Sequence, residues 1–248
     1  MTNKKRIALV TGGMGGLGTA ISRRLHDDGF TVVVGCSPAS ARKNDWLAQQ
    51  AAEGYNFQAL ECDVADWDST VQAFEKLHAE VGAVDVLINN AGITRDGTFR
   101  KMTPENWNAV IRTNLNSLFN TSKQVVDGML GNGWGRIINI SSINGQRGQF
   151  GQVNYSAAKA GVHGFTMALA REVSAKGVTV NTISPGYIKT DMTDAIRPDI
   201  LEGMISGIPV GRLGLPTEIA SMVAWLASDD AAYSTGADFT VNGGMNMQ

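Results

Sequence analysis

A tyrosine and a lysine four residues apart are the first residues whose types and spacing suggest chemistry. Tyr155 and Lys159 lie in a stretch with helical periodicity, where an i, i+4 spacing puts both side chains on one face. Tyrosine has a pKa near ~10, and a neighbouring ammonium favours the phenolate and lowers that pKa. Thirteen residues upstream of the tyrosine, Ser142 follows a predicted buried strand and adds a hydroxyl. Together these residues suit proton donation to a carbonyl oxygen while a hydride reaches its carbon.

A glycine-rich loop near the N-terminus predicts a dinucleotide site. The segment TGGMGGLG lies between a short apolar run and a helical pattern. Glycines in this context permit a tight turn and let the backbone approach a pyrophosphate, while the helix N-terminus supplies N–H groups and partial positive charge. The predicted phosphate contacts are Gly12, Gly13, Met14, Gly15, Gly16, Leu17 and Gly18.

The segment after the second predicted strand indicates which dinucleotide binds. NAD-binding proteins usually place Asp or Glu there to hold the ribose 2′-hydroxyl. Between this strand and Asp45 the chain has no acid, and it offers Gly35, Ser37, Ser40 and Arg42 instead. Hydroxyls and a guanidinium suit a 2′-phosphate, so we predict NADP(H). The alternative is that the basic side chains only form a solvated helix start.

The elements that must position these residues alternate regularly along the chain. Strands are predicted at 7–10, 31–35, 56–61, 84–88, 135–140, 178–183 and 238–241. Helices are predicted at 16–29, 41–53, 67–81, 104–128, 153–176 and 216–228. Several strands are apolar on both faces, as in a parallel sheet covered by helices on both sides. We therefore expect residues 1–248 to form one α/β domain, a Rossmann-type doubly wound parallel sheet of seven strands.

The stretch 189–213 departs from this alternation. It contains several prolines and glycines, has only a weak helical period, and follows the end of a predicted strand, where open α/β sheets bind ligands. We expect a mobile lid over the substrate. An ordinary surface insertion is the alternative.

Composition excludes several other classes of protein. The chain has 248 residues, a net charge of −2 and a pI near 5.9, which does not suit a nucleic-acid binder. Two cysteines cannot build a disulfide framework, and the three histidines show no metal spacing. The N-terminal apolar run is too short for a signal peptide, and no stretch approaches the ~18–20 apolar residues of a membrane helix. We expect a cytoplasmic protein that binds neither a metal nor a membrane.

The order and spacing of these motifs resemble the short-chain dehydrogenase/reductase family over essentially the whole chain. The resemblance implies that Tyr155 is the general acid and that Ser142 polarises the substrate carbonyl. It implies that Lys159 lowers the tyrosine pKa and binds the nicotinamide ribose, and that Asn114 holds a water of a proton relay. One departure is Gly15, where many NADP-dependent relatives carry a basic residue. Further cofactor contacts implied by the resemblance are Asp63, Val64, Asn90, Ala91, Gly92, Pro185, Gly186 and Ile188.

Within the family, three segments are similar to the members that reduce acetoacetyl-CoA to (R)-3-hydroxybutyryl-CoA with NADPH for polyhydroxybutyrate synthesis. They are INNAGITRDGTFRKMT, GQRGQFGQVNYSAAKAG and STGADFTVNGG. Members that reduce 3-oxoacyl groups on acyl carrier protein share most of them, but tend to carry a basic pair before the fifth strand, where this chain has only Arg136. An acidic carrier needs a basic surface, so a short 3-oxoacyl-CoA is the preferred substrate.

The same resemblance assigns a substrate pocket. Phe150 would supply apolar contact, and the amides of Gln149 and Gln152 would bond the thioester or pantetheine. Charged residues after the NNAG motif would meet the CoA phosphates, or belong to a solvated loop. The expected substrate-binding residues are Asp96, Lys101, Ser142, Gln149, Phe150, Gln152, Tyr155, Gly186 and Tyr187.

The resemblance also implies a homotetramer, with interfaces on the helices at 104–128 and 153–176. The small residues expected to permit close packing there are Ala157, Ala158, Ala160, Gly161 and Gly164. A protein that binds NADP(H) without catalysis is the alternative from another class. It is disfavoured because such a protein has no need for the intact set of Ser142, Tyr155, Lys159 and Asn114.

Overall fold

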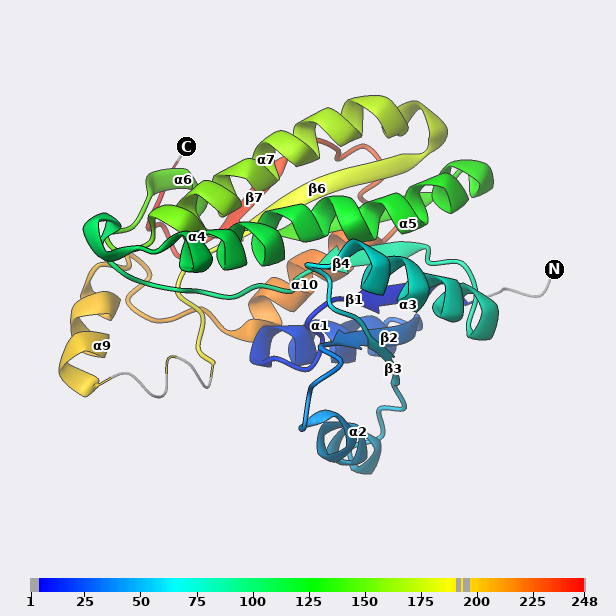
Figure 1. Ribbon diagram of the computed structural model, residues 1–248, viewed down its shortest axis with the longest axis horizontal. Helices are drawn as coiled ribbons and strands as arrows, with labels where there is room; N and C mark the ends of the chain where they lie inside the picture. The colour runs from blue at the N-terminus through cyan, green and yellow to red at the C-terminus, as the bar shows by residue number, and fades with distance from the viewer. Residues whose placement is uncertain (1–4, 191–192, 194–196, 248) are drawn as a thin grey trace.

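The computed structural model describes residues 5–190, 193 and 197–247, and its core is a parallel sheet (Figure 1). Within these residues seven strands are hydrogen-bonded in the order β3-β2-β1-β4-β5-β6-β7, and every pair is parallel. The predicted doubly wound sheet is therefore confirmed. The strands are β1 Ile7–Val10, β2 Thr31–Cys36, β3 Gln58–Glu61, β4 Val86–Asn89, β5 Gly135–Ile140, β6 Val178–Pro185 and β7 Asp238–Val241.

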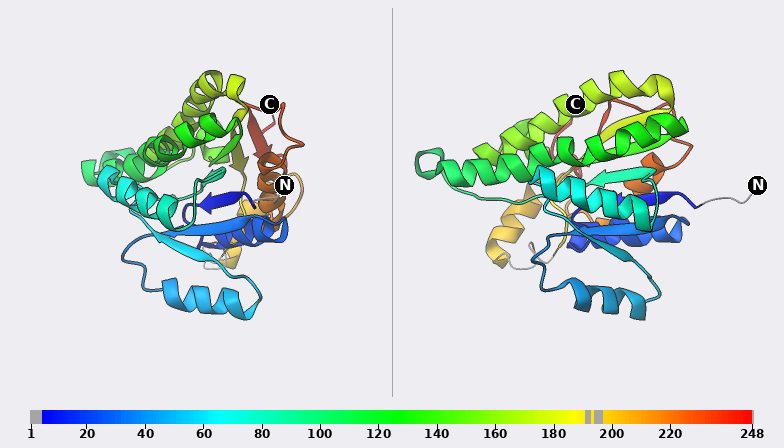
Figure 2. Two further views of the ribbon diagram at one scale, coloured as in Figure 1. Left: turned by 90° about the vertical axis from the view of Figure 1, so that its right-hand side faces the viewer. Right: turned by 45° about the vertical axis from the view of Figure 1, so that its right-hand side comes forward.

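Helices cover the sheet on both faces, as the two turned views show (Figure 2). The strands β1, β4, β5 and β6 are buried along their whole length, which explains their apolar character on both faces. One core cluster joins α1 and α10 to the sheet, and the other joins α3, α5 and α7 to the opposite face. The helices are α1 Gly16–Asp27, α2 Lys43–Ala52, α3 Trp67–Glu80, α4 Pro104–Ile111, α5 Ser117–Asn132, α6 Ile143–Arg147, α7 Val153–Val173, α9 Pro198–Ser206 and α10 Pro216–Ala227.

The predicted helix 104–128 differs from the structure in two ways. It is divided by a π-helical segment, Arg112–Asn116, between α4 and α5. Such wide turns inside α-helices are frequent at functional sites. The helix also continues past the predicted end and stops at Gly133, whose φ of 66° makes the left-handed C-terminal cap that glycine favours.

Three smaller differences concern short elements. The helix α6 was not predicted, because five residues are too few to show a period. The stretch expected to lack clear helical character contains α9. Strands β3 and β4 each begin two residues later than predicted.

A row of buried polar side chains crosses the middle of the sheet. Asn89 on β4 donates to Asn139 on β5 (2.8 Å), and Asn139 donates to Thr166 on α7 (2.9 Å). The Thr166 hydroxyl bonds that of Thr182 on β6 (2.7 Å), and Thr121 on α5 donates to Asn89 (2.7 Å). All five residues are buried. We call the set Asn89, Asn139, Thr166 and Thr182 the polar ladder, and it joins three strands to the helix that carries the YxxxK motif.

No helix among the described residues combines the length and apolar character needed to cross a bilayer.

Candidate active site

The glycine loop connects β1 to α1 at the carboxyl edge of the sheet, and its glycines are required by close contacts. Gly12 has a φ of 61°, and a Cβ there would lie 3.0 Å from the Ala91 Cα. A Cβ on Gly13 would lie 2.9 Å from the Val10 carbonyl oxygen, and one on Gly18 would overlap the Gly12 carbonyl oxygen. The loop therefore packs too tightly against its surroundings for side chains at these positions.

The outer side of the same loop is open. Gly15 and Gly16 are exposed, and a Cβ on Gly15 would meet nothing closer than 3.6 Å. Gly15 is also the N-cap of α1, whose first N–H groups have no acceptor within the helix. Met14 is buried and Leu17 half-buried, so these two side chains support the loop rather than line its outer face. An exposed glycine backbone at a helix N-terminus fits a pyrophosphate.

Thr11 and Asn90 fasten the loop to the end of β4. The Thr11 hydroxyl accepts from the backbone N–H groups of Asn90 and Ala91, both at 3.0 Å. The Asn90 amide donates to the carbonyls of Thr11 (2.9 Å) and Gly12 (3.2 Å). Thr11 was not singled out from the sequence, although it opens the TGGMGGLG motif. The Asn90 side chain therefore holds the glycine loop in place at the end of β4.

The end of β2 carries hydroxyl and basic groups and no carboxylate. Gly35 accepts from the Gly13 N–H (3.0 Å), and a Cβ on it would lie 3.1 Å from the Thr11 Cα, so glycine is needed at this crossing. Ser37 and Arg42 are both exposed, and Arg42 is the N-cap of α2. These two side chains are therefore available to a ligand at this edge.

The predicted adenine contacts follow β3. The Asp63 side chain is exposed and accepts from the Ala65 N–H at 3.0 Å, which closes a turn. The Val64 carbonyl accepts from Asn120 of α5 at 2.9 Å. The structure thus places this pair beside α5 at the carboxyl edge of the sheet.

Lys159 and Asn114 meet beside Gly92, after β4. Lys159 is 5% exposed, and its Nζ donates to the Ile140 carbonyl at the end of β5 (2.7 Å). Asn114, in the π-helical segment, bonds both backbone groups of Ile93 at 2.8 Å. A Cβ on Gly92 would lie 2.9 Å from Asn114 Oδ1 and 3.8 Å from Lys159 Nζ, so glycine leaves room between these two polar groups.

Ser142 follows β5, and its hydroxyl lies close enough to Tyr155 to act on the phenol. Its Oγ accepts from the Asn144 N–H at 3.1 Å and caps α6. Tyr155 lies in the first turn of α7, and its backbone N–H donates to the Asn154 side chain at 2.8 Å. An accepting bond to Oγ makes that hydroxyl a better donor to a carbonyl oxygen.

Burial dominates the ionisation of the Tyr155–Lys159 pair. It raises the pKa of the Tyr155 phenol; the Ser142 hydroxyl opposes this rise, and the charge of Asp96 adds to it. Burial also lowers the pKa of Lys159 to about 8. The Lys159 Nζ lies 5.7 Å from the centre of the tyrosine ring. The expectation that Lys159 lowers the tyrosine pKa stays a prediction, since the lysine is not among the groups that shift it here.

On the substrate side, two of the residues expected to bind substrate are hydrogen-bonded to each other. The Gln152 Oε1 accepts from Asn144 (2.9 Å) and its Nε2 donates one hydrogen to Asp96 (2.9 Å), while its expected bond to substrate stays a prediction. Asp96 was grouped with the residues that meet CoA phosphates, yet its carboxylate orients this amide. The physical reason is that the Gly97 N–H bonds the Gly151 carbonyl (2.8 Å) and brings the two loops together.

Other expected substrate residues remain available at the surface. Phe150 is 87% exposed, which is unusual for a large apolar side chain and leaves it free for an apolar contact. Gln149 and Lys101 are also exposed, Lys101 in the short 3-10 helix Phe99–Lys101.

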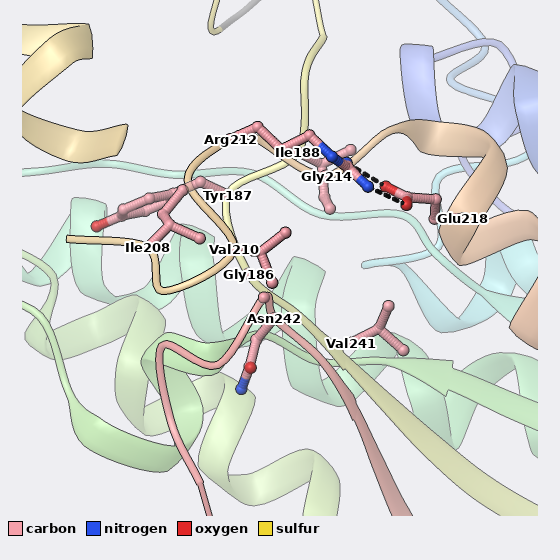
Figure 3. Close-up of a pocket in the computed structure, with 11 residues that line it drawn as sticks. Gly186, Tyr187, Ile188, Ile208, Val210, Arg212, Gly214, Glu218, Val241 and Asn242 are labelled. Atoms are coloured by element: carbon pink, nitrogen blue, oxygen red, sulfur yellow. Dashed lines mark hydrogen bonds and ion pairs between the residues drawn. The ribbon is translucent and has the colours of Figure 1, made fainter. Parts of the chain in front are cut away.

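A pocket of about 160 Å³ opens beside the end of β6 (Figure 3). Pro185 is buried, and a Cβ on Gly186 would lie 2.8 Å from the Asn242 Cα, so these residues turn sharply out of the sheet. Arg212 and Glu218 form a two-pronged ion pair at its rim, with contacts of 2.9 and 2.7 Å. The residues that line it are Gly186, Tyr187, Ile188, Ile208, Val210, Arg212, Gly214, Glu218, Val241, Asn242 and Gly243.

The pocket bears on the predicted lid. Its far wall comes from Ile208 to Gly214, so the end of the stretch 189–213 faces the loop after β6. A Cβ on Gly16 would lie 3.3 Å from Thr190, which brings the start of the same stretch to the glycine loop. Residues 191–192 and 194–196 of the predicted lid lie outside the described residues.

Two of the residues expected at subunit interfaces face the interior of this chain. Ala158 is fully buried, and a Cβ on Gly161 would lie 2.9 Å from Leu115 of the π-helical segment. Both small side chains therefore permit packing within the subunit. Ala157, Ala160 and Gly164 are exposed on α7.

The fold and this set of side chains define a class of oxidoreductase. The family model described as short chain dehydrogenase matches residues 6–201, and the chain belongs to this family. It is 67% identical over 243 residues to an acetoacetyl-CoA reductase of Cupriavidus necator, covering 98% of this chain and 99% of that one. It is 56% identical, with the same coverage, to an acetoacetyl-CoA reductase of Allochromatium vinosum. It is 46% identical to a 3-oxoacyl-[acyl-carrier-protein] reductase of Vibrio harveyi over the full length of both chains.

Proposed function

We propose that the protein reduces acetoacetyl-CoA to (R)-3-hydroxybutyryl-CoA with NADPH, and so supplies the precursor of polyhydroxybutyrate. The observation that carries the proposal is an oxidoreductase site in a chain that is 67% identical, over nearly its whole length, to an acetoacetyl-CoA reductase. The relative that acts on acyl carrier protein is less similar, at 46%.

The residues of the site divide the reaction between them. NADPH supplies the hydride that reduces C3 of the substrate. Ser142, which already accepts from the Asn144 N–H, donates its hydrogen to the 3-oxo oxygen and holds the carbonyl. Tyr155 is protonated at neutral pH, as a phenol is, and burial raises its pKa further. It transfers that proton to the same oxygen.

Lys159 and Asn114 support this transfer. With a pKa of about 8, Lys159 is mainly an ammonium at neutral pH, and it stabilises the phenolate that the transfer leaves. Asn114 lies beside it across Gly92, at a position suited to hold a water that resupplies the proton.

NADP(H) is proposed over NAD(H) because of the groups after β2. Ser37 and Arg42 are exposed after β2, and this segment carries no carboxylate of its own before Asp45. The Glu61 carboxylate opposite Cys36 is paired with Lys43. An Arg42→Ala variant is expected to bind NADPH at least about tenfold more weakly, since charge-assisted bonds are the stronger ones, while NADH affinity stays unchanged. Equal losses for both cofactors would remove Arg42 from the explanation.

The test of the activity is NADPH oxidation with acetoacetyl-CoA as the sole acceptor, followed by absorbance. We expect saturable turnover, much slower with NADH. The same acyl group on acyl carrier protein is assayed in parallel, and a higher kcat/KM there would replace the proposal by the carrier-protein reaction. Folded protein that binds NADPH but turns over neither thioester would contradict both.

We also propose that the enzyme is a cytoplasmic homotetramer, and that residues 189–213 close over the bound substrate. Exposed apolar side chains on the relevant helices, Phe119 of α5 and Met167 of α7, support an interface. Light scattering tests the tetramer, and proteolysis of the lid with and without ligands tests closure.

A further inference from the structure

A hydrogen-bonded cluster lies behind the catalytic residues and is not used by the proposed reaction. The Ser141 hydroxyl donates to the Lys159 backbone carbonyl (2.8 Å) and lies 2.9 Å from His163 Nε2. On the other side of the ring, His163 Nδ1 lies 3.4 Å from Asp238 Oδ2. The order serine, histidine, aspartate is that of a hydrolase, but Ser141 is 3% exposed, so an ester cannot reach its oxygen.

The Asp238 carboxylate is fixed from two further elements. Its Oδ1 accepts from the Ser184 hydroxyl on β6, and its Oδ2 accepts from the Gln146 amide on α6, both at 2.7 Å. The Gln146 oxygen in turn accepts from Asn246 near the C-terminus at 3.0 Å. The histidine is therefore held against an anchored carboxylate, and is not a mobile surface group.

The position of the hydrogens on the His163 ring determines which group the Ser141 hydroxyl bonds. A carboxylate only accepts, so Nδ1 is the ring nitrogen whose hydrogen it favours, and a serine hydroxyl has one hydrogen. If Nε2 also carries a hydrogen, Ser141 accepts from the ring and donates to Lys159. If Nε2 carries none, Ser141 must choose between Nε2 and the Lys159 carbonyl. In the first state His163 orients the Ser141 hydroxyl by donating to it, and in the second it competes with the Lys159 carbonyl for the hydroxyl hydrogen.

Ser141 is joined directly to the reacting groups. It precedes Ser142 in the chain, its N–H bonds the Ile183 carbonyl (2.8 Å), and its hydroxyl holds the helix turn that carries Lys159. The Lys159 ammonium itself is bonded to the carbonyl of Ile140, the residue before Ser141. A shift at Ser141 therefore changes the relative placement of Ser142 and Lys159.

We propose that His163 is a positioning residue for the reduction, which orients Ser141 and thereby aligns Ser142 with the Tyr155–Lys159 helix. The inference rests on the proposed function, since it concerns the same site. It predicts that loss of the ring nitrogens lowers kcat more than it changes KM, because alignment of reacting groups affects the chemical step.

The variants are chosen by which nitrogen they replace. His163→Phe keeps the ring shape and removes both nitrogens. His163→Gln places an amide nitrogen near the position of Nε2 and can still donate to Ser141, whereas the shorter side chain of His163→Asn replaces Nδ1. Arg171→Ala, an exposed change on the same helix, is the matched control.

Wild-type turnover of acetoacetyl-CoA is measured first. If the wild type shows none, the proposed function is refuted but the role of His163 is not, and the variants are then compared on the carrier-protein thioester instead. We expect His163→Phe to lower kcat about tenfold with KM and NADPH affinity within about twofold, and His163→Gln to recover most of that loss. His163→Asn should stay low. An unchanged kcat in His163→Phe, or a rise in KM alone, overturns the proposal. If His163→Phe fails to fold, equal kcat for the Gln and Asn variants overturns it.

Discussion

The burial of the Lys159 ammonium predicts that a catalytically dead variant is more stable than the wild type. The pKa of Lys159 falls from 10.5 to about 8 on folding, because burial disfavours the charged form. A difference of 2.5 between these values corresponds to about 3 kcal/mol of free energy, at ~1.4 kcal/mol for each pKa unit. Methionine is similar in length and carries no charge, so Lys159→Met removes this cost.

The substitution also has a cost of its own. It removes the bond from Nζ to the Ile140 carbonyl, which leaves a buried acceptor and costs about 1–2 kcal/mol. The net expectation at pH 7 is a variant that is about 1–2 kcal/mol more stable to unfolding and has almost no turnover.

The pH dependence separates the charge from the packing. Below pH 8 the lysine is protonated in both the folded and unfolded states, and the full cost is present. Between pH 8 and 10.5 the unfolded state binds more protons, so the free energy of unfolding of the wild type rises with pH through this window. The stability advantage of Lys159→Met should therefore shrink as the pH rises.

The assay is urea denaturation of both proteins at pH 7 and pH 9.5, at one protein concentration because assembly contributes to stability. An advantage of Lys159→Met that is equal at both pH values would refute the reasoning. So would a variant that is clearly less stable at pH 7.

Three further predictions follow from the described contacts. Tyr155→Phe should lower kcat by about 10²–10⁴-fold while NADPH affinity is retained, measured by turnover and fluorescence titration; substantial turnover would contradict the general-acid assignment. Gly18→Ala should lower the thermal unfolding temperature and abolish NADPH binding, because its Cβ overlaps the Gly12 carbonyl oxygen. Gly15→Ala should unfold at the wild-type temperature, since its Cβ meets nothing closer than 3.6 Å, and equal unfolding temperatures for the two variants would contradict the steric argument. Thr166→Val should destabilise the protein by about 1–3 kcal/mol, because it leaves the buried Asn139 amide without an acceptor, and the exposed Thr217→Val is the control in urea denaturation.

Features governed by local geometry were predictable from the sequence. The glycine loop was found because tight turns and close backbone contacts require glycine, and contacts at Gly12, Gly13 and Gly18 are of this kind. The alternation of strands and helices was predictable because burial on both faces gives apolar runs. The i, i+4 spacing of Tyr155 and Lys159 needs only the helix that contains them.

Features made by side chains that meet after folding were not predictable. Gln152 looked free to bind substrate, because nothing in its own segment shows that Asp96, 56 residues earlier, occupies its amide. The π-helical segment at Asn114 was not predicted, because five residues are too few for its hydrophobic periodicity to differ visibly from that of the α-helices on either side. His163 looked like one of three isolated histidines, since its partners Ser141 and Asp238 come from other parts of the chain.

The polar ladder restricts where residues can be inserted into or deleted from this chain. Thr166 lies seven residues after Lys159 on α7, about two helical turns, and its bonds to Asn139 and Thr182 fix the rotation of that helix about its axis. Inserting or deleting one residue between them would turn the catalytic lysine by about 100° relative to the ladder. The number of residues between the catalytic lysine and the ladder is therefore fixed, and tolerated insertions must fall elsewhere, in exposed turns such as Glu53-Gly54 between α2 and β3.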